Sequence, residues 1–241
     1  MTTSNLLNKA VSHDLIALPG TLMDSESLGP LSASMGLPFR VELLGNENIF
    51  DSEIERLAGL ASAPAVWIGH SLGGIAALHL ADRFPKNCIA LIVLASNLRP
   101  DGPLGPEMRA RQINAWEYGG LSALVREQLA PAYGLTTEDT LVAGLVEQAE
   151  RVGAERFRRQ LRYAADRPGL LVKKSNLAIP VLALSAQFDR LSPPACGDEI
   201  VQHVMGASAR HFSLENAGHL LPVQHPDWCA QHILRFLEEI L

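Results

Sequence analysis

Short apolar runs alternate with amphipathic stretches along most of the chain. Four such runs, each stopped by proline, glycine or polar residues, predict buried strands at 14–18, 39–44, 65–68 and 88–95. The stretches between them predict helices at 24–35, 51–61 and 72–84. The alternation returns near the C-terminus, with strands at 179–185 and 210–214 and helices at 196–205 and 227–240. Strands that alternate with helices imply a parallel sheet with helices on both faces.

The segment 98–170 breaks this alternation because it contains no strand-like run. Its periodicity instead predicts four helices, at 105–117, 120–130, 137–151 and 154–166. We therefore expect an α/β fold with a mostly parallel sheet of about six strands. The core would comprise 1–97 and 171–241, and 98–170 would form a helical cap inserted after the fourth strand.

Composition and charge narrow the class of protein. The 241 residues are 47% hydrophobic and 19% charged, which is typical of a globular protein. The net charge of −6 is opposite in sign to the basic footprint of a nucleic-acid binder. No apolar run approaches the roughly 18 residues of a membrane span, and residues 1–12 lack the pattern of a secretory signal. We expect neither nucleic acid nor a membrane as a partner.

The cysteines favour a reducing compartment. Cys88, Cys196 and Cys229 are odd in number, widely spaced and without a CxxC pair. Three buried thiols in a cytoplasmic protein are the simplest interpretation. The histidines show no metal-ligand spacing, and no phosphate-binding glycine motif is present, so we expect no metal and no cofactor.

A candidate catalytic motif lies between a predicted strand and a predicted helix. It is the G-x-S-x-G motif Gly69-His70-Ser71-Leu72-Gly73. The chain must reverse within a few residues there, which strains the serine backbone and favours glycine on either side. Ser71 would lie at the start of a helix, where the Leu72 N–H faces developing negative charge. Ser71 is the predicted nucleophile; a glycine-serine turn without chemistry is the alternative.

A serine nucleophile needs a base and a group that orients the base. Asp189 follows the predicted strand 179–185, and His219 follows the strand 210–214. The order Ser, Asp, His is the one expected for this motif, and the separation of the last two leaves room for one helix and one strand. We predict a triad of Ser71, Asp189 and His219. A helix cap at Asp189 and an ordinary loop histidine at His219 are the alternatives.

These motifs resemble those of a known family. Leu18-Pro19-Gly20-Thr21-Leu22-Met23-Asp24, GHSLGG at 69–74, Asp189 followed by Pro193, and Ala217-Gly218-His219-Leu220 are similar to signatures of small capped serine hydrolases with the α/β-hydrolase fold. The similarity is greatest to short carboxylesterases, a group that includes pimeloyl-carrier-protein methyl ester esterases. The resemblance implies that the loop after the first strand supplies the second oxyanion donor. That donor would be Thr21 or Leu22, acting with Leu72.

The predicted cap carries aromatic and basic side chains. The aromatic residues are candidates for an acyl pocket or for the apolar faces of cap helices: Trp116, Tyr118, Tyr133, Phe157 and Tyr163. Arg158, Arg159 and Arg162 cluster on the predicted helix 154–166. They form either a solvated helix face or a site for an anionic substrate group or an acidic carrier protein.

The sequence thus favours a cytoplasmic serine hydrolase that cleaves a carboxylic ester of a small or medium acyl substrate through an acyl-enzyme. Thioester, lactone or carbon–carbon bond hydrolysis would use the same triad. A non-catalytic binding protein could also retain this fold. The sequence indicates no oligomeric state.

Overall fold

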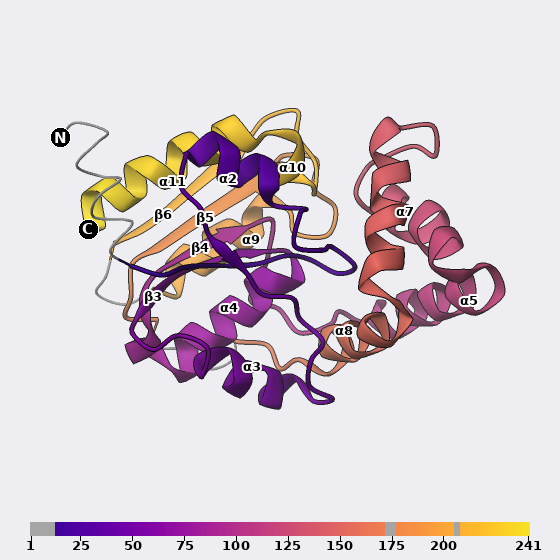
Figure 1. The fold of residues 1–241 in the computed structure, drawn as a ribbon, viewed down its shortest axis with the longest axis horizontal. Helices are drawn as coiled ribbons and strands as arrows, with labels where there is room; N and C mark the ends of the chain where they lie inside the picture. Colours follow the sequence, from indigo (N-terminus) through magenta and orange to yellow (C-terminus); the bar gives the residue numbers. More distant parts are fainter. Residues whose placement is uncertain (1–12, 172–176, 205–207) are drawn as a thin grey trace.

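The computed structural model describes residues 13–171, 177–204 and 208–241. Its centre is a six-stranded sheet in which every neighbouring pair is parallel, in the order β2-β1-β3-β4-β5-β6 (Figure 1). The strands are β1 (Leu15–Leu18), β2 (Arg40–Val41), β3 (Ala65–His70), β4 (Cys88–Leu94), β5 (Val181–Ala186) and β6 (Ala209–Leu214). This confirms the predicted fold class.

Helices cover both faces of the sheet because alternate strand residues point to opposite sides. One face packs on α3 (Phe50–Ala58), α4 (Leu72–Arg83) and α9 (Pro194–Gln202) through a core that includes Trp67 and Leu91. The other face packs on α2 (Gly29–Met35) and α11 (Pro226–Ile240) through Ile68 and Ile92 (Figure 1). A short helix, α10 (Leu221–Gln224), precedes α11.

A helical cap lies beside the sheet, on the right in Figure 1. It comprises α5 (Gly105–Leu124), a π-helical turn (Val125–Leu129), α6 (Ala130–Ala132), α7 (Thr140–Val152) and α8 (Ala154–Asp166). The cap has its own apolar cluster, which Leu22, Met23 and Leu220 of the core join. The loop after β1 and the loop after β6 are therefore both packed against the cap.

Four predicted elements differ clearly from the structure, and most of the others shift by a few residues at one or both ends. The strand expected at 39–44 is only Arg40–Val41, because the carbonyls of Leu43 and Leu44 accept hydrogen bonds from Arg156 instead of extending the sheet. The helix expected from residue 24 starts at Gly29, because the Asp24 carboxylate accepts the backbone N–H groups of two following residues and forms a turn. The helices expected at 105–117 and 120–130 meet at a kink within α5, where Gly120 has φ 71°; α5 ends at Leu124, and a π-helical turn follows at Val125–Leu129.

Two of the predictions made from the sequence concern residues that the structure does not describe. The N-terminal segment 1–12 and residue 205, at the end of the predicted helix 196–205, lie outside the described residues. None of the helices within the described ranges combines the length and apolar character that a membrane crossing requires.

Candidate active site

Ser71 occupies a strained turn between β3 and α4. Its backbone has φ 53° and ψ −119°, a conformation that non-glycine residues rarely adopt. The neighbouring glycines permit the turn: a Cβ on Gly73 would lie 2.0 Å from the Leu18 carbonyl oxygen, and one on Gly69 would lie 2.5 Å from the Cα of Gly74. The Ser71 N–H donates to the Leu94 carbonyl at 3.0 Å, and Ser96 Oγ donates to the Ser71 carbonyl at 2.8 Å. The serine is thus fixed to the end of β4.

The structure brings Ser71, His219 and Asp189 together. The Ser71 Oγ lies 2.8 Å from His219 Nε2, and His219 Nδ1 lies 2.8 Å from Asp189 Oδ2. A carboxylate only accepts, so His219 Nδ1 carries the proton and Nε2 is free to accept the serine hydroxyl. The loops after β5 and β6 supply the last two residues, as the sequence predicts.

Asp189 remains a carboxylate although it is buried. Burial acts to raise its pKa, but hydrogen bonds from His219 and from the N–H groups of Ser192 and Leu191 hold the pKa below its ordinary value. Both N–H groups bind Oδ1, at 2.8 and 2.9 Å, which leaves Oδ2 for the histidine. Asp189 therefore both caps its own turn and orients His219.

His70, the second residue of the G-x-S-x-G motif, contacts the backbone of His219. Its Nε2 lies 2.9 Å from the His219 carbonyl oxygen, so Nε2 is the protonated nitrogen. Burial and the neighbouring His219 lower the pKa of His70 to about 3. The ring is therefore neutral at physiological pH and acts as a hydrogen-bond donor to the backbone carbonyl of His219.

The structure distinguishes the two candidates for the second oxyanion donor. The Leu22 N–H is engaged, because it donates to Gln160 Oε1 on α8 at 2.9 Å. Thr21 lines the same cavity as Ser71 and Leu72. Leu72 begins α4, so its N–H belongs to the first turn, where a helix offers no internal acceptor. We therefore keep Thr21, together with Leu72, as the proposed pair of oxyanion donors.

A cavity of about 300 Å³ opens at Ser71 and His219. Of the five aromatic candidates, Tyr133 lines it and stacks on the His219 ring, with centroids 5.1 Å apart. Trp116, Phe157 and Tyr163 pack elsewhere, and Tyr118 is 90% exposed. The Tyr163 hydroxyl instead lies within hydrogen-bond distance of the Glu47 carbonyl and the Glu53 carboxylate, and it donates its one proton to one of them at a time. The structure brings only Tyr133 of these five to the described cavity wall.

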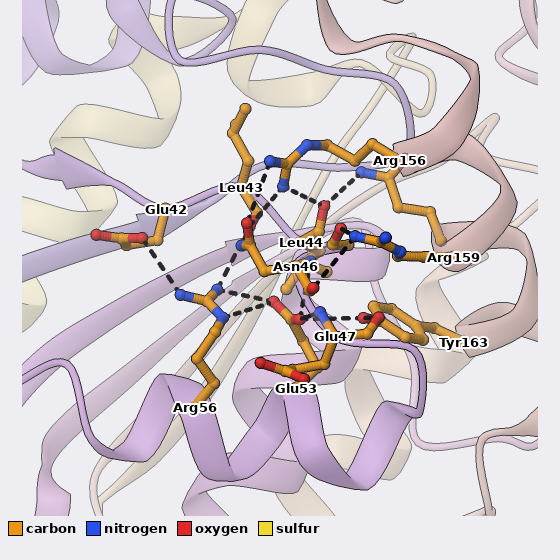
Figure 2. Close-up of polar contacts among 12 residues, drawn as sticks. Glu42, Leu43, Leu44, Asn46, Glu47, Glu53, Arg56, Arg156, Arg159 and Tyr163 are labelled. Carbon is orange, nitrogen blue, oxygen red and sulfur yellow. Dashed lines mark hydrogen bonds and ion pairs between the residues drawn. The ribbon is translucent and has the colours of Figure 1, made fainter.

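Arg156 and Arg159 of α8 contact a loop of the core (Figure 2). Arg156 donates to the carbonyls of Leu43 and Leu44, and Arg159 donates to those of Gly45 and Asn46. Arg162 reaches the Asn48 carbonyl at 3.2 Å. Arg158 instead lies over the Trp116 ring, 4.8 Å from its centroid. Three of these guanidinium groups therefore fasten the cap to the loop 43–48.

A second serine, histidine and aspartate form a similar chain of hydrogen bonds. The Ser185 Oγ lies 2.7 Å from His211 Nε2, and His211 Nδ1 lies 2.8 Å from Asp198 Oδ1. Ser185 is buried within β5 and does not line the cavity. Matching hydrogen bonds alone therefore do not mark a nucleophile; the strained turn and the cavity distinguish Ser71 from Ser185.

Gln160 is a residue of the site that the sequence did not lead us to predict. It is buried at the cavity wall, where Oε1 accepts from Leu22 and Nε2 donates to the Leu44 carbonyl at 3.0 Å. A signal was available: Gln160 stands three residues after Phe157 and four before Ala164, on the apolar side of an amphipathic helix. A polar residue at such a position needs a partner.

No group of three or more His, Cys, Asp or Glu side chains that could hold a metal ion occurs in the described part of the chain. The three cysteines are free and buried, and burial raises the pKa of Cys196 to about 11. These thiols are therefore protonated and unreactive at neutral pH.

The chain belongs to the alpha/beta hydrolase family, whose model matches residues 12–232. A pimeloyl-[acyl-carrier protein] methyl ester esterase of Neisseria meningitidis serogroup C is 24% identical over 200 residues, which cover 79% of this chain and 77% of the relative. The resemblance expected from the sequence is confirmed, and the protein is a hydrolase.

Solved structures agree on the fold. A thermophilic esterase from Thermogutta terrifontis superposes with a TM-score of 0.78 at 20% identity, covering 95% of this chain and 90% of that one. The enol-lactonase from Burkholderia xenovorans gives 0.77 at 21% identity, with 94% and 92% covered. At this identity the neighbours establish the fold, and the reaction must be argued from the site.

Proposed function

We propose that this protein hydrolyses a carboxylic ester of a small or medium acyl chain through an acyl-enzyme on Ser71. The observation that carries the proposal is the 2.8 Å contact between Ser71 Oγ and His219 Nε2 at the wall of a cavity. The same cavity contains the first turn of α4 and Thr21. A nucleophile, a base and two backbone donors thus meet where a carbonyl carbon can enter.

The reaction follows from these positions. Ser71 attacks the ester carbonyl while His219 accepts its proton, and Asp189 stabilises the imidazolium that forms. The N–H groups of Leu72 and Thr21 bind the oxyanion, a contribution of several kcal/mol where donors are preorganised. His219 then protonates the leaving alcohol. Water, deprotonated by the same histidine, attacks the acyl-enzyme and releases the acid.

Two further observations support an ester as the substrate and a reducing compartment as the location. The curated relative from Neisseria meningitidis serogroup C is named a methyl ester esterase, which favours ester hydrolysis over the thioester, lactone and carbon–carbon alternatives. The three free thiols are compatible with work in the cytoplasm.

A labelling experiment and a substrate panel test the proposal together. A fluorophosphonate probe should add one adduct, mapped by peptide sequencing to Ser71. Turnover should then be measured on p-nitrophenyl esters of increasing acyl length, one thioester and one lactone, and the esters should give the highest kcat/KM. A protein that binds the esters but takes up no probe would be a binding protein on this fold, and the proposal would fail.

A further inference from the structure

One wall of the active-site cavity carries more positive than negative charge. Its charged lining residues in the described chain, besides His219, are Arg99, Asp101, Arg109 and Arg167. Arg99 is neutralised from outside the cavity, because its Nε donates to Glu199 Oε2 at 2.9 Å. Asp101 is left as the counterion of two guanidinium groups, so the wall retains one uncompensated positive charge.

The Asp101 carboxylate does not pair fully with either guanidinium group. The Oδ1 atom lies 3.1 Å from Arg109 Nη2 and 3.9 Å from Arg167 Nη1, so both arginines share a single carboxylate oxygen. Arg109 also donates from Nη1 to Gln112 at 3.0 Å, but its buried Nε has no partner among the described residues. Donor capacity is therefore left over on the cavity wall.

The surplus charge lies where water screens it poorly. Arg167 is only 8% exposed; its Nε donates to the Arg99 carbonyl at 3.1 Å and its Nη1 donates to the Ala164 carbonyl. Burial lowers the pKa of Arg167 to about 10; Asp101 opposes this effect and the charge of Arg109 adds to it. Burying two cations beside one anion is costly, and an anion bound in the cavity would offset that cost.

We propose that Arg109 and Arg167 bind a carboxylate of the substrate, so that the preferred ester carries a free carboxylate group. This inference rests on the proposed function, because the bound ester must reach Ser71 in the same cavity. A carboxylate matches the single surplus charge, whereas a phosphate would bring a charge of about −1.5 to −2. Its two oxygens also fit the planar fork of a guanidinium.

The position of this subsite in the fold limits the size of the substrate. Asp101 follows β4, Arg109 lies on α5 and Arg167 follows α8, so the chain contributes them where it enters and leaves the cap. A volume of about 300 Å³ is at the small end of ligand pockets. A monoester of a short dicarboxylic acid is therefore the substrate class. The cap arginines 158, 159 and 162 do not line this cavity.

Kinetics with paired esters test the subsite. The kcat/KM values are measured for the monomethyl and dimethyl esters of succinate, glutarate and adipate, and the wild type should prefer the monoester. Arg109→Gln should lower the monoester-to-diester ratio roughly ten- to hundredfold, the range expected for lost hydrogen bonds to a charged group. Arg111→Gln is the matched control: it lies on the same helix, pairs with Glu107 at 3.6 Å and does not line the cavity, so the ratio should stay at the wild-type value.

Binding without turnover separates this inference from the proposed function. Calorimetry measures the Kd of monomethyl glutarate for Ser71→Ala and for Ser71→Ala with Arg109→Gln. If Ser71→Ala binds monomethyl glutarate at least tenfold more tightly than the double variant does, the result supports the subsite even where no ester is hydrolysed. Equal binding by the two variants, or equal losses on monoester and diester in the kinetic comparison, would overturn it.

Discussion

The Gln160 side chain of the cap accepts the backbone N–H of Leu22, the residue next to the proposed oxyanion donor Thr21, at 2.9 Å. The same amide donates to the Leu44 carbonyl, and Leu22 has a positive φ of 56°. A helix of the cap therefore fixes the loop of the core that must present a backbone N–H to the substrate. Docking of the cap and the geometry of the proposed oxyanion hole are linked through one side chain.

We predict that Gln160→Leu lowers kcat by about tenfold with little change in KM, because Thr21 loses its fixed position while the cavity keeps its apolar wall. Removing an oxyanion donor outright costs about 100-fold or more, so a displaced donor should cost less. The measurement is steady-state kinetics on a p-nitrophenyl ester, with thermal unfolding in parallel.

Tyr163→Phe is the control for this variant. It removes contacts of α8 with Glu47 and Glu53 but leaves Gln160 and Leu22 untouched (Figure 2). It should lower the melting temperature without changing kcat. If both variants lower kcat equally, Gln160 acts only by holding the cap in place.

The arginines of α8 should matter for stability more than for substrate choice. Replacing Arg158, Arg159 and Arg162 together with Gln removes donors to the carbonyls of Gly45, Asn46 and Asn48. We expect a loss of about 1–3 kcal/mol in the free energy of unfolding, measured by urea denaturation. Losses in kcat/KM should be equal for anionic, carrier-linked and neutral esters. A loss in kcat/KM only for the anionic or carrier-linked ester would show that these residues take part in substrate recognition.

Acid should destabilise the protein through its buried histidines. Burial lowers the pKa of His70 to about 3 and that of His79 to about 4, both below the ordinary value of 6.5. Below pH 6.5 the unfolded chain therefore binds protons that the folded chain does not. The stability from each histidine is fully present above pH 6.5 and falls by about 1.4 kcal/mol per pH unit below it.

His79 tests this linkage without disturbing the active site, since it packs edge-on against Phe50. The free energy of unfolding is measured at pH 7 and pH 5 for the wild type and for His79→Met. The variant should lose about 2 kcal/mol less than the wild type over this interval. An identical loss would show that folding does not lower the pKa of His79.

Asp189→Asn should lower kcat by several orders of magnitude with a small effect on KM. The amide can donate to His219 Nδ1, which stabilises the wrong tautomer and removes the charge that supports the imidazolium. Near-wild-type activity would show that Asp189 only caps its turn. Asp101 could not replace Asp189 as the acid that orients His219, because Asp101 is paired with Arg109 and Arg167.

Local patterns in the sequence predicted the sheet, the elbow and the loops that carry Asp189 and His219. Each depends on short-range information: apolar runs set the strands, and the ends of parallel strands meet at one edge. The roles of Gln160 and the cap arginines depend on contacts between residues more than 100 positions apart. Helical periodicity shows which face of α8 is buried but not which loop it meets, so Arg159 could equally be read as a binding residue or a solvated one.

The most direct test of the proposed nucleophile compares two serines that both contact a histidine. Ser71→Ala and Ser185→Ala are prepared, circular dichroism establishes that both are folded, and kcat is measured on the best ester of the panel. We predict that Ser71→Ala loses at least 1,000-fold in kcat, as is typical of a deleted nucleophile, while Ser185→Ala stays within about threefold of the wild type. If Ser71→Ala retains more than about a tenth of the wild-type kcat, Ser71 is not the nucleophile and the proposed mechanism is wrong.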